Sequence, residues 1–205
     1  MEYAIFFLVL LIVDRISRSS RYKGKYGEKE VIKILKGFPK GYIVLNDLLL
    51  ENGSKTSQID HIVLCKNGIF VIETKNYGGY ISGNESDKMW TQKIGRRKKK
   101  FEFFNPIIQN KGHINAIKQN LKINNTIPII SVVVFNNKGN IDNVSSHTPV
   151  IHSSELEDFI LKYDTNVSLN GSEVQNINLA LTGKNIKGKK ARKQHVKNIQ
   201  KRYVS

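Results

Sequence analysis

The chain has 205 residues, of which 40% are hydrophobic, and carries 33 Lys and Arg against 17 Asp and Glu, which gives a formal charge of +16 at pH 7. This length suits one ordinary domain with short extensions rather than two domains. The charge favours polyanionic partners, either nucleic acid or an anionic membrane surface. The single cysteine, Cys65, excludes an intramolecular disulfide framework and a metal site built on paired cysteines, and a reducing compartment is the simpler interpretation.

An unbroken apolar run, residues 3–13, lies near the N-terminus and is followed by Asp14 and then by basic residues. A membrane-spanning helix needs about 20 residues, so this run is short for a span and also suits a buried helix. A secretory signal is disfavoured, because no basic residue precedes the run and no small-residue cleavage site follows it. We expect residues 1–23 to be a membrane anchor and basic linker, with the remaining chain facing the cytoplasm. A cytoplasmic, soluble protein in which the run is a packing helix is the alternative.

The first helix is expected over residues 24–37, which end at Gly37, a natural stop. Its apolar residues recur at helical spacing: Val31, Ile34 and Leu35. Glu28 lies in the first turn, where the helix dipole favours an acidic side chain. A contribution of Glu28 to a functional site is the competing interpretation. Residues 42–50 predict the first strand.

Two apolar runs, residues 58–65 and 68–75, predict a β-hairpin. They are joined by Asn67-Gly68, and Asn-Gly between two β-rich runs is a strong hairpin signal. We expect these two residues to form the centre of the turn.

The hairpin carries Asp60 on its first strand and Glu73 and Lys75 on its second. Glu73 and Lys75 are two residues apart and therefore project from the same face. With the expected turn, Asp60 lies opposite Lys75 and Ile62 lies opposite Glu73. The two carboxylates and the amine should therefore meet in an apolar sheet, where they are costly to desolvate unless they pair or bind an ion.

Two polar neighbours of Asp60, Gln58 and His61, are weaker candidates for a functional role than the three charged residues. Gln58 is two residues from Asp60, so it should share its face, either as ordinary sheet polarity or to orient a water or a phosphate. His61 points to the opposite face and is expected to be a structural residue.

A basic segment follows the hairpin. Residues 80–82 predict a short strand, Trp90 is expected at a sheet edge, and residues 93–100 hold six Lys or Arg in eight positions. Such a run is usually a solvated loop, but it could also track a phosphate backbone. The phenylalanines that follow it, Phe101, Phe103 and Phe104, are expected in the core rather than as stacking platforms.

Residues 105–121 predict a helix, with Pro106 suited to its first turn and with Gln109 and His113 four residues apart on one face. Residues 128–135 form a continuous β-branched run typical of a strand buried on both faces. A further strand at 150–151 and a helix at 153–163 are predicted beyond it.

An Asp on one strand followed by Glu-x-Lys on the next resembles the active site of PD-(D/E)xK nucleases. The wider series resembles the nuclease-related domain, NERD, over about residues 24–135. The positions that carry this resemblance are Gly27-Glu28, residues 58–63, residues 68–77, residues 79–83 with their Gly-x-Ile-x-Gly pattern, Trp90, and Asn105-Pro106 ahead of Gln109-Asn110. The resemblance implies an α/β (α+β) fold with a restriction-endonuclease-like αβββαβ core, in which helices flank a mixed central sheet. The predicted order of elements agrees with that core independently of the motif.

The resemblance also implies metal-dependent hydrolysis of phosphodiester bonds. Asp60, Glu73 and the carbonyl of Thr74 would hold Mg²⁺ or Mn²⁺, since these hard cations prefer oxygen ligands. Lys75 would position the attacking water and offset phosphate charge, and Glu28 would complete the site. Gln109 is a secondary candidate, as is Gln58, and His113 is a weaker one.

Three segments are expected: 1–23, a nuclease-like domain over 24–183, and a basic tail over 184–205. Candidate nucleic-acid contacts lie in the basic run and the tail: Arg96, Arg97, Lys98, Lys99, Lys100, Lys189, Lys190, Arg192 and Lys193. DNA is favoured over RNA as the partner. Two other interpretations stay open: a catalytically idle module that tethers nucleic acid to a membrane, and a structural salt bridge among the three charged strand residues.

Overall fold

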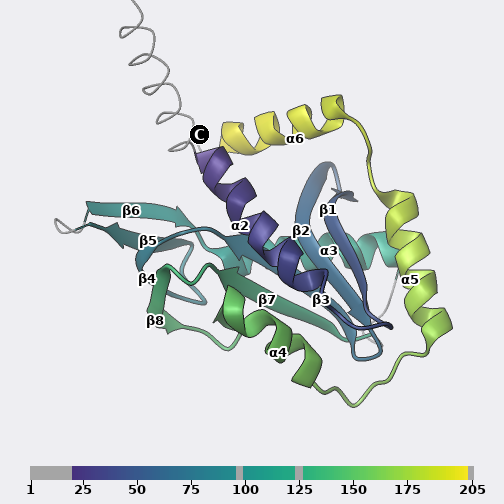
Figure 1. Ribbon diagram of the computed structural model, residues 1–205. Coiled ribbons are helices and arrows are strands. Elements are labelled where there is room, and N and C mark those ends of the chain that lie inside the picture. Colours follow the sequence, from purple (N-terminus) through teal and green to yellow (C-terminus); the bar gives the residue numbers. More distant parts are fainter. Residues whose placement is uncertain (1–19, 96–98, 123–126, 203–205) are drawn as a thin grey trace, which may run out of the picture.

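The structure of the protein, a computed structural model, describes residues 20–95, 99–122 and 127–202 (Figure 1). The apolar run 3–13 and the predicted contacts Arg96, Arg97 and Lys98 lie outside the described residues. Within the described part of the chain, no helix has the length and hydropathy needed to cross a bilayer.

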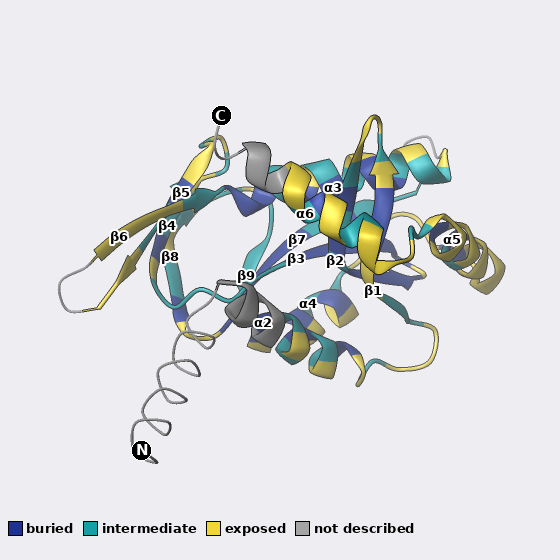
Figure 2. Ribbon diagram, turned by 90° about the horizontal axis from the view of Figure 1, so that it is seen from above, coloured by how far each residue is buried: buried dark blue, intermediate teal, exposed yellow. Residues whose placement is uncertain are grey.

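A mixed five-stranded sheet forms the centre of the fold, with the strands in the order β1-β2-β3-β7-β9. β1, β2 and β3 are antiparallel neighbours, whereas β7 and β9 run parallel to β3. The strands are β1 (Ile43–Asn52), β2 (Lys55–Cys65), β3 (Gly68–Lys75), β7 (Ile129–Phe135) and β9 (Val150–His152). β3 and β7 are buried on both faces over most of their length, as their continuous apolar sequences predict (Figure 2).

Helices cover both faces of this sheet (Figure 2). α2 (Ser20–Leu35) and α4 (Leu156–Lys162) pack on one face, where Val31 and Leu156 join Phe70 and Ile72 in one apolar cluster. α3 (Pro106–Leu121) and α5 (Gly171–Lys184) pack on the other face. A short 3₁₀ turn, η1 (Ser153–Glu155), precedes α4, and α6 (Lys189–Arg202) follows α5. The predicted restriction-endonuclease-like order of helix, three strands, helix and strand is confirmed.

A second, four-stranded sheet adjoins the first, with the strands in the order β6-β5-β4-β8. Its strands are β4 (Gly79–Asn84), β5 (Met89–Ile94), β6 (Lys99–Phe104) and β8 (Gly139–Ser145). Trp90 is fully buried between the sheets and stacks on Phe135, with ring centroids 6.4 Å apart. The prediction of Trp90 at a sheet edge was therefore wrong. The loop predicted at 93–100 was wrong for Lys93, Ile94, Lys99 and Lys100, which lie in paired strands.

The hairpin between β2 and β3 is two residues out of the predicted register. Cys65 pairs with Gly68, so Lys66 and Asn67 form the turn, and Ile62 pairs with Val71 instead of Glu73. Gly68 has a φ of +124°, and a Cβ there would lie 2.4 Å from the carbonyl oxygen of Pro128. Glycine is thus required as the first residue of β3, where β7 approaches closely. Because a shift of two residues preserves the faces of a strand, the convergence of the charged residues survives this error.

Candidate active site

The candidate site lies where β2 separates from β3. Pairing between these strands ends at His61 and Ile72, whereas β3 remains paired with β7 as far as Lys75. The carboxylate of Asp60 takes the place of the missing backbone partner, since its Oδ2 accepts a hydrogen bond of 2.9 Å from the Thr74 amide. The carbonyl of Lys75 faces β7, where it accepts from Asn136 at 3.2 Å. Because successive residues of a strand point their backbone groups to opposite sides, the Thr74 carbonyl points toward Asp60.

Glu73 is the centre of a buried hydrogen-bonded network. Lys75 Nζ donates to Glu73 Oε1 at 2.6 Å and to Gln109 Oε1 at 3.0 Å. His113 Nε2 lies 3.0 Å from Glu73 Oε2, and its Nδ1 lies 2.7 Å from Ser57 Oγ. A carboxylate only accepts hydrogen bonds, so Nε2 carries a proton toward Glu73. In the neutral imidazole, Nδ1 then accepts from the Ser57 hydroxyl.

The charged groups in this network stabilise one another in their ionised forms. Burial by itself would raise the pKa of Glu73, but Lys75 and His113 outweigh it and lower that pKa below its usual range. Burial likewise would lower the pKa of Lys75, but the carboxylate of Glu73 reverses this and raises it. Glu73 and Lys75 are therefore an ionised, nearly dry pair, with side-chain exposures of 2% and 15%.

Asp60 has the opposite electrostatic character. Burial and the negative charge of Glu73 raise its pKa well above the usual value, and only the Thr74 amide and Lys75 act against this rise. In the described part of the chain, Asp60 forms no salt bridge. A carboxylate held in this way lowers its free energy by taking up a proton or by binding a cation.

α2 brings Glu28 to the same place. Its charge adds to the rise in the Asp60 pKa, which puts Glu28 within electrostatic reach of the site. The helix can approach because residue 27 is glycine: a Cβ there would lie 2.7 Å from Cβ of Asn76, one residue beyond Lys75. Gly27 thus allows α2 to pack closely, and this packing places the Glu28 carboxylate near Asp60.

α3 supplies Gln109 and His113 and is fixed at two points. Asn105 caps it by accepting from the Ile107 amide, and also donates to three carbonyls at the end of β4 and in the loop that follows it. Asn110 is fully buried and donates to the Val71 carbonyl at 2.8 Å. These bonds hold the helix against β3 beside the site.

Two sequence candidates lie outside this network. Gln58 Nε2 donates to Asp47 Oδ1 at 2.8 Å, so the structure pairs it with β1. Ile59 and Ile62 pack in the same cluster, which shows that the alternation of β2 shifts by one residue next to Asp60. Gln58 therefore does not keep the face predicted from a regular strand. His61 is buried and bonded to Asn46 Oδ1, and burial lowers its pKa to about 4, in keeping with a structural role.

The oxygen donors of the site fit a divalent ion such as Mg²⁺. In the described ranges, no three His, Cys, Asp or Glu side chains form a ready-made metal-binding group. Mg²⁺ does not need one, because it commonly takes one or two carboxylates and keeps several waters. Asp60, the Thr74 carbonyl and one oxygen of Glu73 are hard oxygen donors of that kind. The raised pKa of Asp60 is the observation that favours a cation beside it.

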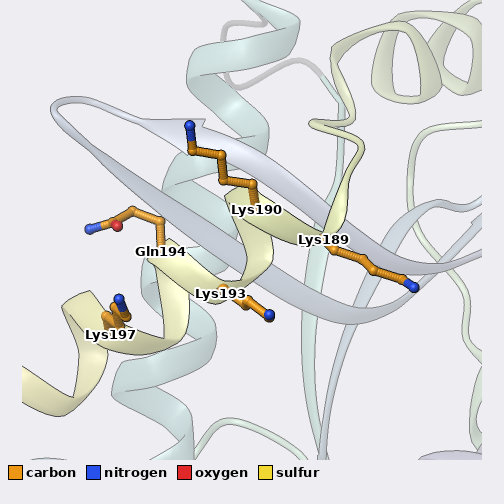
Figure 3. A pocket seen from close by; sticks show the side chains of 5 residues that line it. All are labelled: Lys189, Lys190, Lys193, Gln194 and Lys197. Atoms are coloured by element: carbon orange, nitrogen blue, oxygen red, sulfur yellow. The ribbon is translucent and has the colours of Figure 1, made fainter.

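Basic side chains lie near the same end of the central sheet. Because β2 is antiparallel to β3, the start of β2 lies beside the end of β3, and α6 is attached there through His195 and Thr56, 2.7 Å apart. A recess of about 430 Å³ lies along α6 (Figure 3), and its lining residues are Lys189, Lys190, Lys193, Gln194 and Lys197. Arg192, also predicted as a nucleic-acid contact, binds the side chain and the carbonyl of Asp47. It therefore holds α6 on β1, while the lysines remain exposed.

His113 and Ser57 are the site residues that the sequence signal understated. The four-residue spacing of Gln109 and His113 did place both on one helix face, but nothing local showed that this face meets Glu73. Ser57 gave no signal, because its partner is 56 residues away.

Comparisons with known proteins show the family of this chain. The family model "Nuclease-related domain" (NERD) matches residues 23–136, more than half of the chain. An uncharacterized protein of Bacillus anthracis is 38% identical over 216 aligned residues, which cover 100% of this chain and 99% of that protein. The chain therefore belongs to the nuclease-related domain family, which is part of the PD-(D/E)xK-like superfamily.

Proposed function

We propose that this protein is a metal-dependent nuclease that hydrolyses phosphodiester bonds in nucleic acid. The observation that carries the proposal is the contrast between the two carboxylates. Glu73 is neutralised by Lys75, whereas Asp60, beside it, has a raised pKa and no salt bridge in the described part of the chain. Such a separation of pKa values between neighbouring acids is typical of catalytic sites.

Asp60, Glu73 and the Thr74 carbonyl would hold Mg²⁺ or Mn²⁺. When bound, such an ion supplies positive charge for the phosphate and water molecules of lowered pKa. Side chains of the protein would orient the water and offset the phosphate charge. The Lys75 ammonium is held by Glu73 and Gln109, so it is positioned to orient a water molecule and to offset charge that develops on the phosphate. Glu28, on α2, would add a further carboxylate to the site, and His113 holds the second oxygen of Glu73.

The charge of the chain supports a nucleic-acid substrate. Lys99 and Lys100 are exposed on β6, and Lys189, Lys190 and Lys193 are exposed on α6. Contacts of lysines with phosphates release counterions, so binding should weaken steeply with salt. DNA is the favoured substrate.

We further propose that residues 1–23 tether the protein to the membrane with its domain in the cytoplasm, on the strength of the apolar run and the basic residues after it. In cell fractionation, the full chain should sediment with membranes and stay there in high salt. Recovery in the supernatant at low salt would contradict the tether. Release by high salt alone would show that the basic residues, and not the apolar run, hold the protein.

The proposal is tested by incubating the purified full chain with labelled single-stranded and double-stranded DNA and RNA, in Mg²⁺, Mn²⁺ or EDTA. We expect cleavage of at least one substrate with either metal and none in EDTA. Tight binding without cleavage of any substrate would favour the alternative, a catalytically idle nucleic-acid-binding module at the membrane.

A further inference from the structure

The hairpin of β5 and β6 carries its aromatic side chains in an unusual place. Trp90 and Phe103 pair across it and face the protein body, where Trp90 stacks on Phe135. Two residues further out on β6, Phe101 is on the same face by strand alternation, but half of it, 50%, is exposed. The face that forms the core thus continues outward as an uncovered aromatic surface.

Lysines surround this surface. Ile94, 41% exposed, pairs with Lys99 next to Phe101. On the opposite face, Tyr80, Lys93 and Lys100 form one cross-strand row, in which Tyr80 is 56% exposed. Glu102 is the single acid in the described strands of the hairpin, and it pairs with Lys100 at 3.1 Å on the surface.

Protection of a sheet edge does not account for this composition. Lysines on an edge strand do discourage pairing with another chain. Exposed Phe101 and Ile94 would promote such pairing, so edge protection explains the lysines and leaves the apolar side chains unexplained. Scattered exposed apolar residues are common, but here Phe101 and Ile94 lie on one face of the hairpin together with Lys99.

Single-stranded nucleic acid matches this combination of an exposed ring and a cation on one face. Unpaired bases offer their faces to aromatic rings, and lysines meet the phosphates. Phenylalanine has no hydrogen-bonding group with which to read a base edge, so stacking is the contact open to it. In a duplex, the base faces are covered by their neighbours, and Phe101 would gain little without intercalation.

The hairpin is firmly connected to the candidate site. β6 runs through Asn105 directly into α3, which carries Gln109 and His113. β4, which pairs with β5, begins four residues after Lys75. A strand stacked on Phe101 would therefore be held at a fixed place relative to Glu73 and Lys75.

We propose that the outer part of the described β5–β6 strands is a binding site for single-stranded nucleic acid, in which Phe101 stacks on a base and Lys99, on the same face, contacts a phosphate. The proposal deepens the nuclease function by naming single-stranded segments as the substrate class. As a statement about binding, it does not depend on catalysis.

The test is fluorescence anisotropy in EDTA, with the purified full chain and labelled 15-nucleotide single strands of DNA and RNA, alongside a DNA duplex. Phe101→Ala should weaken binding of single strands about 10-fold, and Phe101→Leu should weaken it similarly, because leucine keeps the apolar surface but not the ring. Phe101→Trp should bind at least as well as the wild type. Duplex affinity should be unchanged in all three. Lys99→Gln should instead lower the salt dependence of binding, by about 1 in the slope of log K against log salt.

Leu179→Ala is the matched control, because Leu179 is also an exposed apolar residue, 59% accessible, but lies on α5. Its affinity should equal that of the wild type. Unchanged binding of single strands by Phe101→Ala would overturn the proposal, as would an equal loss for duplex and single strand. Because this test measures binding alone, in EDTA, its outcomes are independent of the nuclease test, which can fail or succeed separately.

Discussion

Asp60→Asn is expected to lower the rate of metal-dependent cleavage by about 1000-fold or more, because the substitution removes the carboxylate charge that a divalent ion would neutralise. Glu73→Gln should have a loss of similar size. Lys75→Ala should also slow cleavage strongly, but its affinity for Mn²⁺ should stay close to that of the wild type, since the ammonium is not a metal ligand. Single-turnover cleavage and calorimetric titration with Mn²⁺ measure the two effects separately.

Asp142→Asn is the control for this series. Asp142 is an exposed strand carboxylate on β8, outside the site, and its substitution should leave both cleavage and Mn²⁺ affinity unchanged. Wild-type cleavage by Asp60→Asn would remove Asp60 from the mechanism. Loss of Mn²⁺ binding in Lys75→Ala would show that the lysine acts by shaping the metal site.

Without a bound metal, in EDTA, the carboxylates of Glu73 and Asp60 should have opposite effects on folding stability. The pKa of Glu73 is lowered by folding, so its ionised form contributes stability above its unfolded pKa, and that stability is lost as the pH falls through the folded pKa. Glu73→Gln leaves the buried Lys75 without its counter-ion, and we expect it to lower the free energy of unfolding at pH 7 by about 3 kcal/mol, or roughly 6–12 °C in Tm.

The pKa of Asp60 is raised by folding, so the sign reverses. Its contribution to stability is present at low pH and is lost as the pH rises through the folded pKa. Asp60→Asn keeps an oxygen for the Thr74 amide but carries no charge. We therefore expect it to unfold at a higher temperature than the wild type at pH 7, by about 2–4 °C, with the difference disappearing in acid. Thermal unfolding at several pH values measures both variants, and destabilisation by Asp60→Asn would contradict the electrostatic description of the site.

The central elements of the fold were predictable because their signals are strong and local. The uninterrupted apolar runs of β3 and β7, the capped helix after Asn105 and the glycine at position 37 each define an element within a few residues. The second sheet was not predictable in the same way. β6 alternates aromatic and charged residues next to a basic run in the sequence, a pattern that also suits a solvated loop. The neighbouring strand β5 packs through Trp90 on Phe135, which is distant in the sequence.

For the candidate site, strand alternation was sufficient to bring Glu73 and Lys75 together, and it tolerated a register error of two residues. Strand alternation wrongly predicted that Gln58 shares the face of Asp60. The reason is that β2 is irregular next to Asp60, and Asp47 on the neighbouring strand has a φ of +55°. Contacts between remote segments were also out of reach: His113 with Glu73, and Arg192 with Asp47. Such partners are determined by packing of the whole chain, and no local pattern encodes them.

The claim that Asp60 makes this a metal-dependent nuclease site is tested most directly by cleavage of one labelled single-stranded oligonucleotide by the full chain. Wild type and Asp60→Asn are compared in Mg²⁺ and in EDTA, with thermal unfolding confirming that the variant is folded. We predict that the wild type cleaves in Mg²⁺ and not in EDTA. Asp60→Asn should cleave in neither, although it unfolds at a higher temperature than the wild type. Cleavage that persists in EDTA or in folded Asp60→Asn would contradict the claim.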